Sequence, residues 1–266
     1  MLTFNKYVRP KTVEEAYHLA QNPRNVIIGG MLWLKMQDRM VNTAIDLCDL
    51  DLDRIEETDN QFIIGAMVTL RQLELHEGLN AYTQQAMCES VRHIVGVQFR
   101  HLATVGGSLF GRFGFSDVLT MFMALDAQVE LAHGGIIPIR EFAEMPYTKD
   151  VLVRIYVKKT PVKVAYLSQR NTATDFPVLT CAVSCIDQQY VCVIGARPLK
   201  AMAFYDEDGD LNQADDENIS RFAQKIADKI VVGSNMRASS EYRRRITPVL
   251  IKRAFQILKG EENYGN

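Results

Sequence analysis

The sequence predicts an α+β fold in which short helices and short strands form three small lobes. Residues 1–160 mix helix-like and strand-like segments, whereas the remaining residues run through several strands and end in helices. One further observation excludes a common alternative. Neither of the glycine pairs that follow apolar runs fits the Gly-x-Gly-x-x-Gly pattern that opens a helix in Rossmann dinucleotide-binding domains.

Helix-start and turn signals divide the first part of the chain. Thr12 and Glu15 have capping-box spacing, and Asn22-Pro23 ends the helix that they begin. Thr69 and Gln72 form a second capping box. Gly134 and Gly135 have the flanks of a β-hairpin turn. The other elements expected here are strands at 26–28, 44–47, 62–64, 128–131, 136–138 and 151–157, and helices at 32–40, 83–95 and 117–125.

The last part of the chain is expected to form a sheet covered by helices. Strands are predicted at 163–169, 178–186 and 190–196, an acidic surface loop at 206–216, and helices at 218–231 and 240–258. Pro248 lies inside the last helix and is expected to kink or divide it. The arginine triplet 243–245 is expected to be a solvated face of that helix.

Composition excludes several classes of function. The formal net charge is -2, and no basic patch suits nucleic acid. No apolar run approaches the roughly 20 residues that span a bilayer, and the N-terminus has no signal-peptide layout, so a cytoplasmic location is expected. The five cysteines have no paired spacing, and Cys181 and Cys185 are expected to be core thiols. No metal site is predicted.

Two glycine pairs carry the functional prediction. Residues 104–108 read Thr-Val-Gly-Gly-Ser, and Gly29 and Gly30 follow the apolar run at 26–28. A glycine pair allows close approach of a ligand, and successive amides beside hydroxyl groups can form a nest of donors for an anion such as a pyrophosphate. Either pair alone is better explained by an ordinary turn. Together, they could clamp one diphosphate from two sides.

The inventory of catalytic side chains is thin. The five histidines are scattered, none has metal-ligand spacing, and there is no Gly-x-Ser-x-Gly nucleophile motif. A chain that offers anion-binding loops without an acid, base or nucleophile is suited to holding a cofactor that performs the chemistry. A flavin fits this description, and no catalytic residue is assigned.

The chain resembles the flavin-binding medium subunits of the molybdenum hydroxylases, the xanthine dehydrogenase and carbon monoxide dehydrogenase family. That family carries an Ala-Gly-Gly-Thr-Asp-like loop and, later, a Gln-Ile-Arg-Asn-x-Ala-Thr-Val-Gly-Gly-Asn stretch followed by a Ser-Asp or Ala-Asp pair. Here the second stretch reads QFRHLATVGGS from Gln98 to Ser108, and Ser116-Asp117 follows. The similarity spans nearly the whole chain.

The resemblance implies a fold and a domain division. It implies a two-subdomain FAD-binding fold of the PCMH/VAO type, followed by a sheet-and-helix domain of the carbon monoxide dehydrogenase flavoprotein type. The expected limits are residues 1–55 for the first FAD-binding subdomain, 56–159 for the second, and 160–266 for the C-terminal α+β domain.

The resemblance also implies which residues bind FAD. The predicted site includes the positions that match the family, the positions that depart from its pattern, and the neighbouring tryptophan. These residues are Ile27, Ile28, Gly29, Gly30, Met31, Leu32, Trp33, Thr104, Gly106, Gly107, Ser108, Asp117, Leu152 and Leu167. Asp117 is also explained as a helix N-cap, and Trp33 either stacks on the cofactor or packs in the core. The departures are Met31-Leu32 for Thr-Asp, Ser108 for Asn, Phe115 for Pro and Leu167 for Lys.

Three functions remain open at this point. By resemblance, the chain is the FAD subunit of a molybdenum hydroxylase and passes electrons from [2Fe-2S] centres to NAD or another acceptor. Its partners are then a molybdenum-cofactor large subunit and a [2Fe-2S] small subunit. The departures motivate a flavin-free structural or assembly subunit instead. A stand-alone flavin oxidoreductase is the third option, and the lack of substrate-directed acids and bases argues against it.

Overall fold

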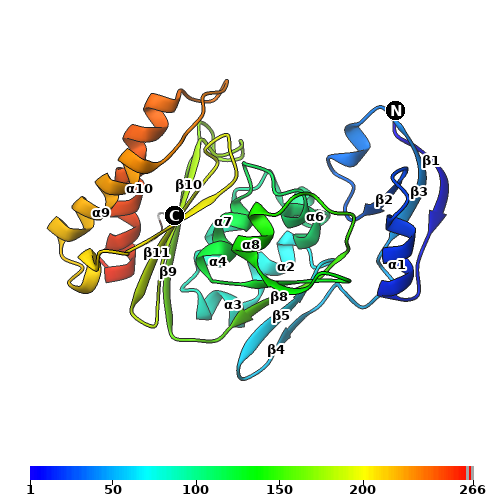
Figure 1. Cartoon of the computed structure of the whole chain (residues 1–266), viewed down its shortest axis with the longest axis horizontal. Helices are drawn as coiled ribbons and strands as arrows, with labels where there is room; N and C mark the ends of the chain where they lie inside the picture. Colours follow the sequence, from blue (N-terminus) through cyan, green and yellow to red (C-terminus); the bar gives the residue numbers. More distant parts are fainter. Residues whose placement is uncertain (262–263, 265–266) are drawn as a thin grey trace.

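Three separate β-sheets follow one another along the chain in the computed structural model, which describes residues 1–261 and Tyr264 (Figure 1). Each sheet carries its own helices, and we call the three assemblies the N-terminal, middle and C-terminal units. The predicted α+β class is therefore confirmed.

The N-terminal unit is a small parallel sheet in the order β1-β3-β2. Its elements are β1 (Thr3–Val8), α1 (Val13–Ala20), β2 (Asn25–Ile28), the 3-10 turn η1 (Leu34–Met36) and β3 (Met40–Asp46). The Thr12 hydroxyl accepts a hydrogen bond from the Glu15 amide, as its capping role predicts (3.1 Å). The helix expected at 32–40 is wrong: only η1 forms, because β3 already begins at Met40.

The middle unit is an antiparallel sheet in the order β4-β5-β8-β6-β7, packed against short helices. Its strands are β4 (Ile55–Glu57), β5 (Gln61–Gly65), β6 (Gln128–Leu131), β7 (Gly135–Pro138) and β8 (Leu152–Lys158). Its helices are α2 (Leu70–Leu75), α3 (Glu77–Tyr82), α4 (Ala86–Arg92), α5 (Val97–Arg100), α6 (Val105–Phe110), α7 (Asp117–Ala124) and α8 (Ile139–Glu144).

Two predictions for the middle unit are confirmed and one is wrong. Thr69 and Gln72 make both bonds of a capping box, and the glycine pair at 134–135 connects β6 to β7 as a hairpin. The single helix predicted at 83–95 does not form. Gln84 and Gln85 have positive φ angles of 48° and 69°, which interrupt a right-handed helix and confine it to α4.

The C-terminal unit is an antiparallel sheet in the order β12-β11-β10-β9. Its elements are β9 (Val162–Gln169), β10 (Leu179–Ile186), β11 (Gln189–Gly195), β12 (Met202–Tyr205), the 3-10 turn η2 (Asp210–Asn212), α9 (Asp216–Lys229) and α10 (Ser240–Lys259). Helix α10 is not divided at Pro248. Arg243 is not solvated either: it is fully buried and donates hydrogen bonds to the carbonyls of Val178, Gly233 and Ala238.

The sheet of the C-terminal unit is buried on both faces. Helices α9 and α10 cover its outer face (Figure 1), and α4 and α7 of the middle unit contact the other. Along β10, Cys181 and Val183 pack toward α9 and α10, whereas Ala182 belongs to the core of the middle unit. This alternation follows from the two-residue period of a strand. Because alternate residues of β10 enter the core of the middle unit, the C-terminal unit packs firmly against the rest of the chain.

Within the described part of the chain, no helix has the length and hydropathy that crossing a bilayer requires.

Candidate functional site

The loop that follows β2 presents unused hydrogen-bond donors. The backbone amides of Gly29, Gly30, Met31 and Leu32 donate to no acceptor among the described residues. Met31 has a positive φ of 58°, a conformation that ordinary side chains seldom adopt and that accompanies the turn from β2 into η1. Backbone donors without an internal partner require water or a ligand. This loop therefore has backbone donors free for water or for a ligand such as an anion.

The second glycine pair lies in a helix rather than in a free turn. Thr104 is the N-cap of α6, and its hydroxyl accepts a hydrogen bond from the Gly107 amide (3.1 Å). The Gly106 amide donates to the Ala66 carbonyl (2.8 Å) and the Val105 amide to that of Val68 (2.8 Å). These amides have internal acceptors, so the unbonded donors belong to the loop at 29–32, and a diphosphate contact by residues 104–108 stays a prediction. This block contributes its shape and its hydroxyl groups.

The two glycine pairs meet in space. A Cβ atom added to Gly29 would lie 2.6 Å from the Thr104 hydroxyl oxygen, and one added to Gly30 would overlap the Leu102 carbonyl. Glycine at both positions is thus explained by close approach between the loop and the start of α6. The two glycine blocks therefore lie together as the sequence predicts, and that they clamp a diphosphate stays a prediction.

Two clefts open on either side of this contact. The aromatic cleft, of about 350 Å³, runs from Gly30 past Trp33 and Ser108 to Asp117. The second, of about 450 Å³, runs from Gly106 to Leu152, and we call it the Leu152 cleft. Gly29, Thr104 and Gly107 line both. Val26, Ile27 and Phe113 line both clefts as well, so the clefts meet along these six residues, and we call the part formed by Gly29, Thr104 and Gly107 the waist.

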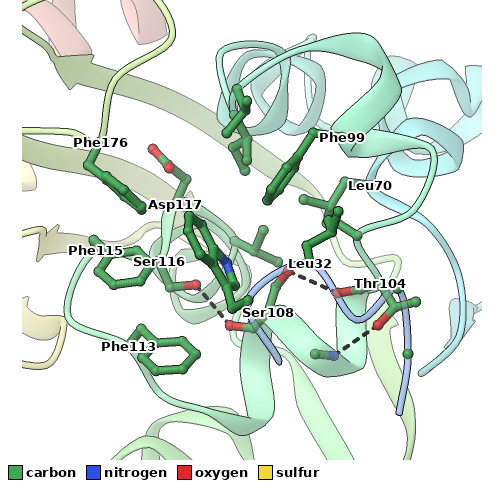
Figure 2. A pocket seen from close by; sticks show the side chains of 18 of the residues that line it. Leu32, Leu70, Phe99, Thr104, Ser108, Phe113, Phe115, Ser116, Asp117 and Phe176 are labelled. Carbon is green, nitrogen blue, oxygen red and sulfur yellow. Dashed lines mark hydrogen bonds between the residues drawn. The ribbon is translucent and has the colours of Figure 1, made fainter. Parts of the chain in front are cut away.

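Aromatic side chains from all three units line the aromatic cleft. Figure 2 shows Phe113, Phe115 and Phe176 on one side and Phe99 on the other. The Trp33 ring lies 5.7 Å from that of Phe99 and 5.5 Å from that of Phe176, and Phe115 lies 4.5 Å from Phe176. These rings give the cleft flat apolar walls, the kind of surface on which a planar ring system stacks.

Asp117 is held at the end of the aromatic cleft by two donors. The Tyr166 hydroxyl and the Arg170 guanidinium each donate to its Oδ1 at 2.5 Å. Burial raises the pKa of the Asp117 carboxyl above its ordinary value, and the charge of Arg170 opposes that shift. Asp117 is not the N-cap of α7; that role belongs to Ser116, whose hydroxyl accepts from the Leu119 amide (3.1 Å).

The structure brings most of the predicted residues to the two clefts. Those lining the aromatic cleft are Ile27, Gly29, Gly30, Met31, Leu32, Trp33, Thr104, Gly107, Ser108 and Asp117, and those lining the Leu152 cleft are Ile27, Ile28, Gly29, Thr104, Gly106, Gly107 and Leu152. Leu167 lines neither. It packs with the core under α9 and α10, because Tyr166 takes the opposite face of β9.

Several lining residues were not predicted from sequence. Phe99, Phe115 and Phe176 complete the aromatic wall, and Arg170 fixes Asp117. Phe99 and Phe115 lie inside or next to the glycine block, which is a signal for them. Phe176 lies on the connection between β9 and β10, and nothing local in the sequence points to the cleft.

These residues fit an extended dinucleotide such as FAD. The loop at 29–32 offers unbonded amides beside the waist, one cleft offers aromatic walls, and the other is lined by Leu152. Oriented backbone amides stabilise phosphate oxygens without a charged side chain. Met31 and Leu32 remove two side-chain polar contacts from the loop but leave its backbone donors in place.

Comparison with known proteins gives the family. Residues 2–158 match the model of the FAD-binding domain in molybdopterin dehydrogenases, so the chain belongs to this family and is an FAD-binding subunit of the molybdenum hydroxylase type. The cofactor is FAD. This result confirms the resemblance and the fold inferred from sequence.

Individual relatives agree with this assignment. The chain is 25% identical over 253 residues to the uncharacterised protein YgfM of Escherichia coli K12, with 92% of this chain and 93% of YgfM covered. It is 31% identical over 134 residues to the nicotinate dehydrogenase FAD-subunit of Eubacterium barkeri, covering 47% of this chain and 45% of that one. A chain of Hydrogenophaga pseudoflava carbon monoxide dehydrogenase superposes with a TM-score of 0.85 at 19% identity, covering 97% and 98% of the two chains, which shows the shared fold.

Proposed function

We propose that this chain is the electron-transfer subunit of a molybdenum-containing hydroxylase or dehydrogenase similar to xanthine dehydrogenase. Electrons from iron–sulfur centres of a partner pass through the bound FAD to NAD or another acceptor. FAD supplies the exchange of single electrons on one side and of an electron pair on the other. The chain itself supplies binding, orientation and exclusion of water.

The proposal rests on one arrangement, in which the loop that has unbonded amides lies at the waist between the two clefts. The amides at residues 29–32 would hold the diphosphate beside Thr104 and Gly107. The isoalloxazine ring would enter the aromatic cleft, and the adenine would enter the Leu152 cleft. With the diphosphate at the waist, both ends of the cofactor reach a cleft of suitable chemistry.

The described side chains orient the ring rather than react with it. Asp117 is engaged by Tyr166 and Arg170, so its carboxylate shapes the end of the aromatic cleft instead of acting as a free base. Ser108 lies on the wall with its hydroxyl donating to the Thr104 carbonyl (2.9 Å). No side chain that lines the cleft is placed as a substrate-directed acid or base, which is why we place substrate turnover on another chain.

The proposed partners follow from the same reasoning. A chain that holds FAD but no substrate site requires an electron donor, and the relatives' names describe a FAD-subunit and a medium chain. We therefore propose a molybdenum-cofactor large subunit and a [2Fe-2S] small subunit as partners, with NAD as a possible acceptor.

One observation favours a second candidate, a structural or assembly subunit with the same fold that binds FAD only weakly. Met31 and Leu32 are apolar where the resembled family has Thr-Asp, so two polar contacts to a cofactor are missing. Each is worth about 1 kcal/mol. Free backbone donors at the same loop argue against this alternative.

Titration of the purified chain with FAD separates the two candidates. We expect saturable uptake and a flavin absorbance spectrum that dithionite bleaches. A chain that remains colourless after gel filtration from excess FAD supports the structural subunit. Reduction of the bound flavin by the assembled complex with its substrate, but not by the isolated chain, tests the electron-transfer step.

A further inference from the structure

Trp33 joins the three units at the aromatic cleft. It follows the donor loop of the N-terminal unit, yet its ring contacts Phe99 of α5 in the middle unit and Phe176 of the C-terminal unit. Its exposed fraction is 42%, which is large for a tryptophan that touches two other rings. A residue placed in this way is accessible from the cleft rather than sealed in a core.

The contact on the C-terminal side is made by a braced loop, residues 170–177. Arg170 ties one end of this loop to Asp117 (2.5 Å). Near the other end, Asp175 accepts from Arg237 (3.0 Å), and the Arg237 guanidinium lies 4.8 Å from the centre of the Phe176 ring. Phe176 thus has a cation on one side and Trp33 as a neighbouring ring. The loop lies outside residues 2–158, which match the family's FAD-binding domain.

The Trp33–Phe176 contact leaves no slot for another ring. Their centres are 5.5 Å apart with the planes at 31°. A flat ring system placed between two others requires them to be about 7 Å apart, because each stacked contact takes about 3.5 Å. The aromatic cleft is therefore closed between these two rings, and an isoalloxazine ring can lie between them only if one of the two moves.

We propose that Trp33 is the stacking residue for the isoalloxazine ring, and that FAD exchanges the Trp33–Phe176 contact for a ring stacked on Trp33 and backed by Phe176. This inference rests on the proposed function. Stacking on Trp33 compensates for the polar side-chain contacts that this loop lacks, because Met31 and Leu32 are apolar. It also makes the C-terminal unit, through Phe176, part of the cofactor site.

The test uses the whole chain and the fact that Trp33 is its single tryptophan. An indole in contact with an excited isoalloxazine ring quenches flavin emission by electron transfer, whereas a phenyl ring does not. FAD affinity is measured by equilibrium dialysis, and emission is measured per bound flavin. The variants are Trp33→Phe, Trp33→Leu and Phe176→Leu, with Tyr205→Leu as an aromatic control outside both clefts.

Trp33→Phe should keep an affinity near that of the wild type but brighten the bound flavin. Trp33→Leu should brighten it and weaken binding about three- to ten-fold, the range expected for one lost aromatic pair. Phe176→Leu should weaken binding while emission stays low, and Tyr205→Leu should change neither. If wild-type chain binds FAD but both Trp33 variants match it in affinity and emission, the stacking role is wrong and the proposed function stands. If wild-type chain retains no FAD in dialysis, both fail.

Discussion

The contact between the two glycine blocks can be tested by a double-mutant cycle at Gly29 and Thr104. Gly29→Ala places a Cβ 2.6 Å from the Thr104 hydroxyl oxygen and 3.2 Å from its methyl carbon. Carbon and oxygen normally approach to about 3.3 Å, so the neighbours must separate by roughly 0.7 Å. Gly29 has no left-handed φ, so the backbone itself admits alanine.

The expected energies follow from this geometry. Gly29→Ala should cost about 1–3 kcal/mol of unfolding free energy as an overpacking change. Thr104→Ala should cost about 1 kcal/mol because the Gly107 amide loses its cap. In the double variant the clashing oxygen and methyl are gone, so its cost should be close to that of Thr104→Ala alone. The coupling should then equal the cost of Gly29→Ala, about 1–3 kcal/mol, in favour of the double variant.

Urea unfolding of the FAD-free chain measures these energies, and FAD titration of the same variants reports the site. Gly96→Ala is the matched control, because its added Cβ would meet only the Gln98 side chain at 3.5 Å. Strictly additive costs at Gly29 and Thr104 would refute the contact, and with it the waist on which the cofactor site depends.

Three further predictions test other parts of the site and fold. Gly30→Ala should weaken FAD binding more than Gly29→Ala, because its Cβ would overlap the backbone carbonyl of Leu102, which no side-chain rearrangement relieves; dialysis of the two variants checks this order. Burial acts to raise the pKa of the Glu74 carboxyl, but the charges of Arg100 and Arg71 outweigh it and lower the pKa. Arg100 donates two hydrogen bonds to this carboxylate, at 2.7 and 3.1 Å. The stabilising contribution of the Glu74 carboxylate is therefore present above its unfolded-state pKa and is lost as the pH falls through its lower folded-state pKa. Glu74→Gln should lower the free energy of unfolding by about 3 kcal/mol or more at neutral pH. A curve of stability against pH should also become flatter on its acid side in this variant. Leu167→Lys should lower the melting temperature without raising FAD affinity, since Leu167 packs under α9 and α10; a gain in affinity would return this position to the cofactor site.

Local signals in the sequence predicted the elements whose causes are local. Thr12 and Thr69 cap the helices that they were expected to cap, and the hairpin at 134–135 forms as its glycines indicate. The meeting of the two glycine pairs was also predictable, because a family pattern supplied the long-range information. The strands β1, β4 and β12 were missed, since short segments with exposed positions carry little apolar alternation.

The features that the sequence did not predict depend on contacts between segments far apart in the chain. The amides of Val105 and Gly106 donate hydrogen bonds to the carbonyls of Val68 and Ala66, about forty residues earlier. No local feature of the sequence near the glycine pair predicts these acceptors. Arg243 resembles a solvated arginine in sequence, yet its guanidinium donates to the Val178 carbonyl before β10 and to two carbonyls on the connection between α9 and α10. Phe176 reaches the cleft only because β9 and β10 carry its loop there.

The buried sheet of the C-terminal unit has a consequence for how this chain can be altered. One face of β9, β10 and β11 supplies Val164, Tyr166, Ala182 and Val193 to the core shared with α4 and α7. A fragment ending near residue 158 would leave those two helices facing water with an apolar surface meant for a sheet. Chimeras between relatives should therefore exchange the last hundred or so residues together with their facing helices, and not as a detachable module.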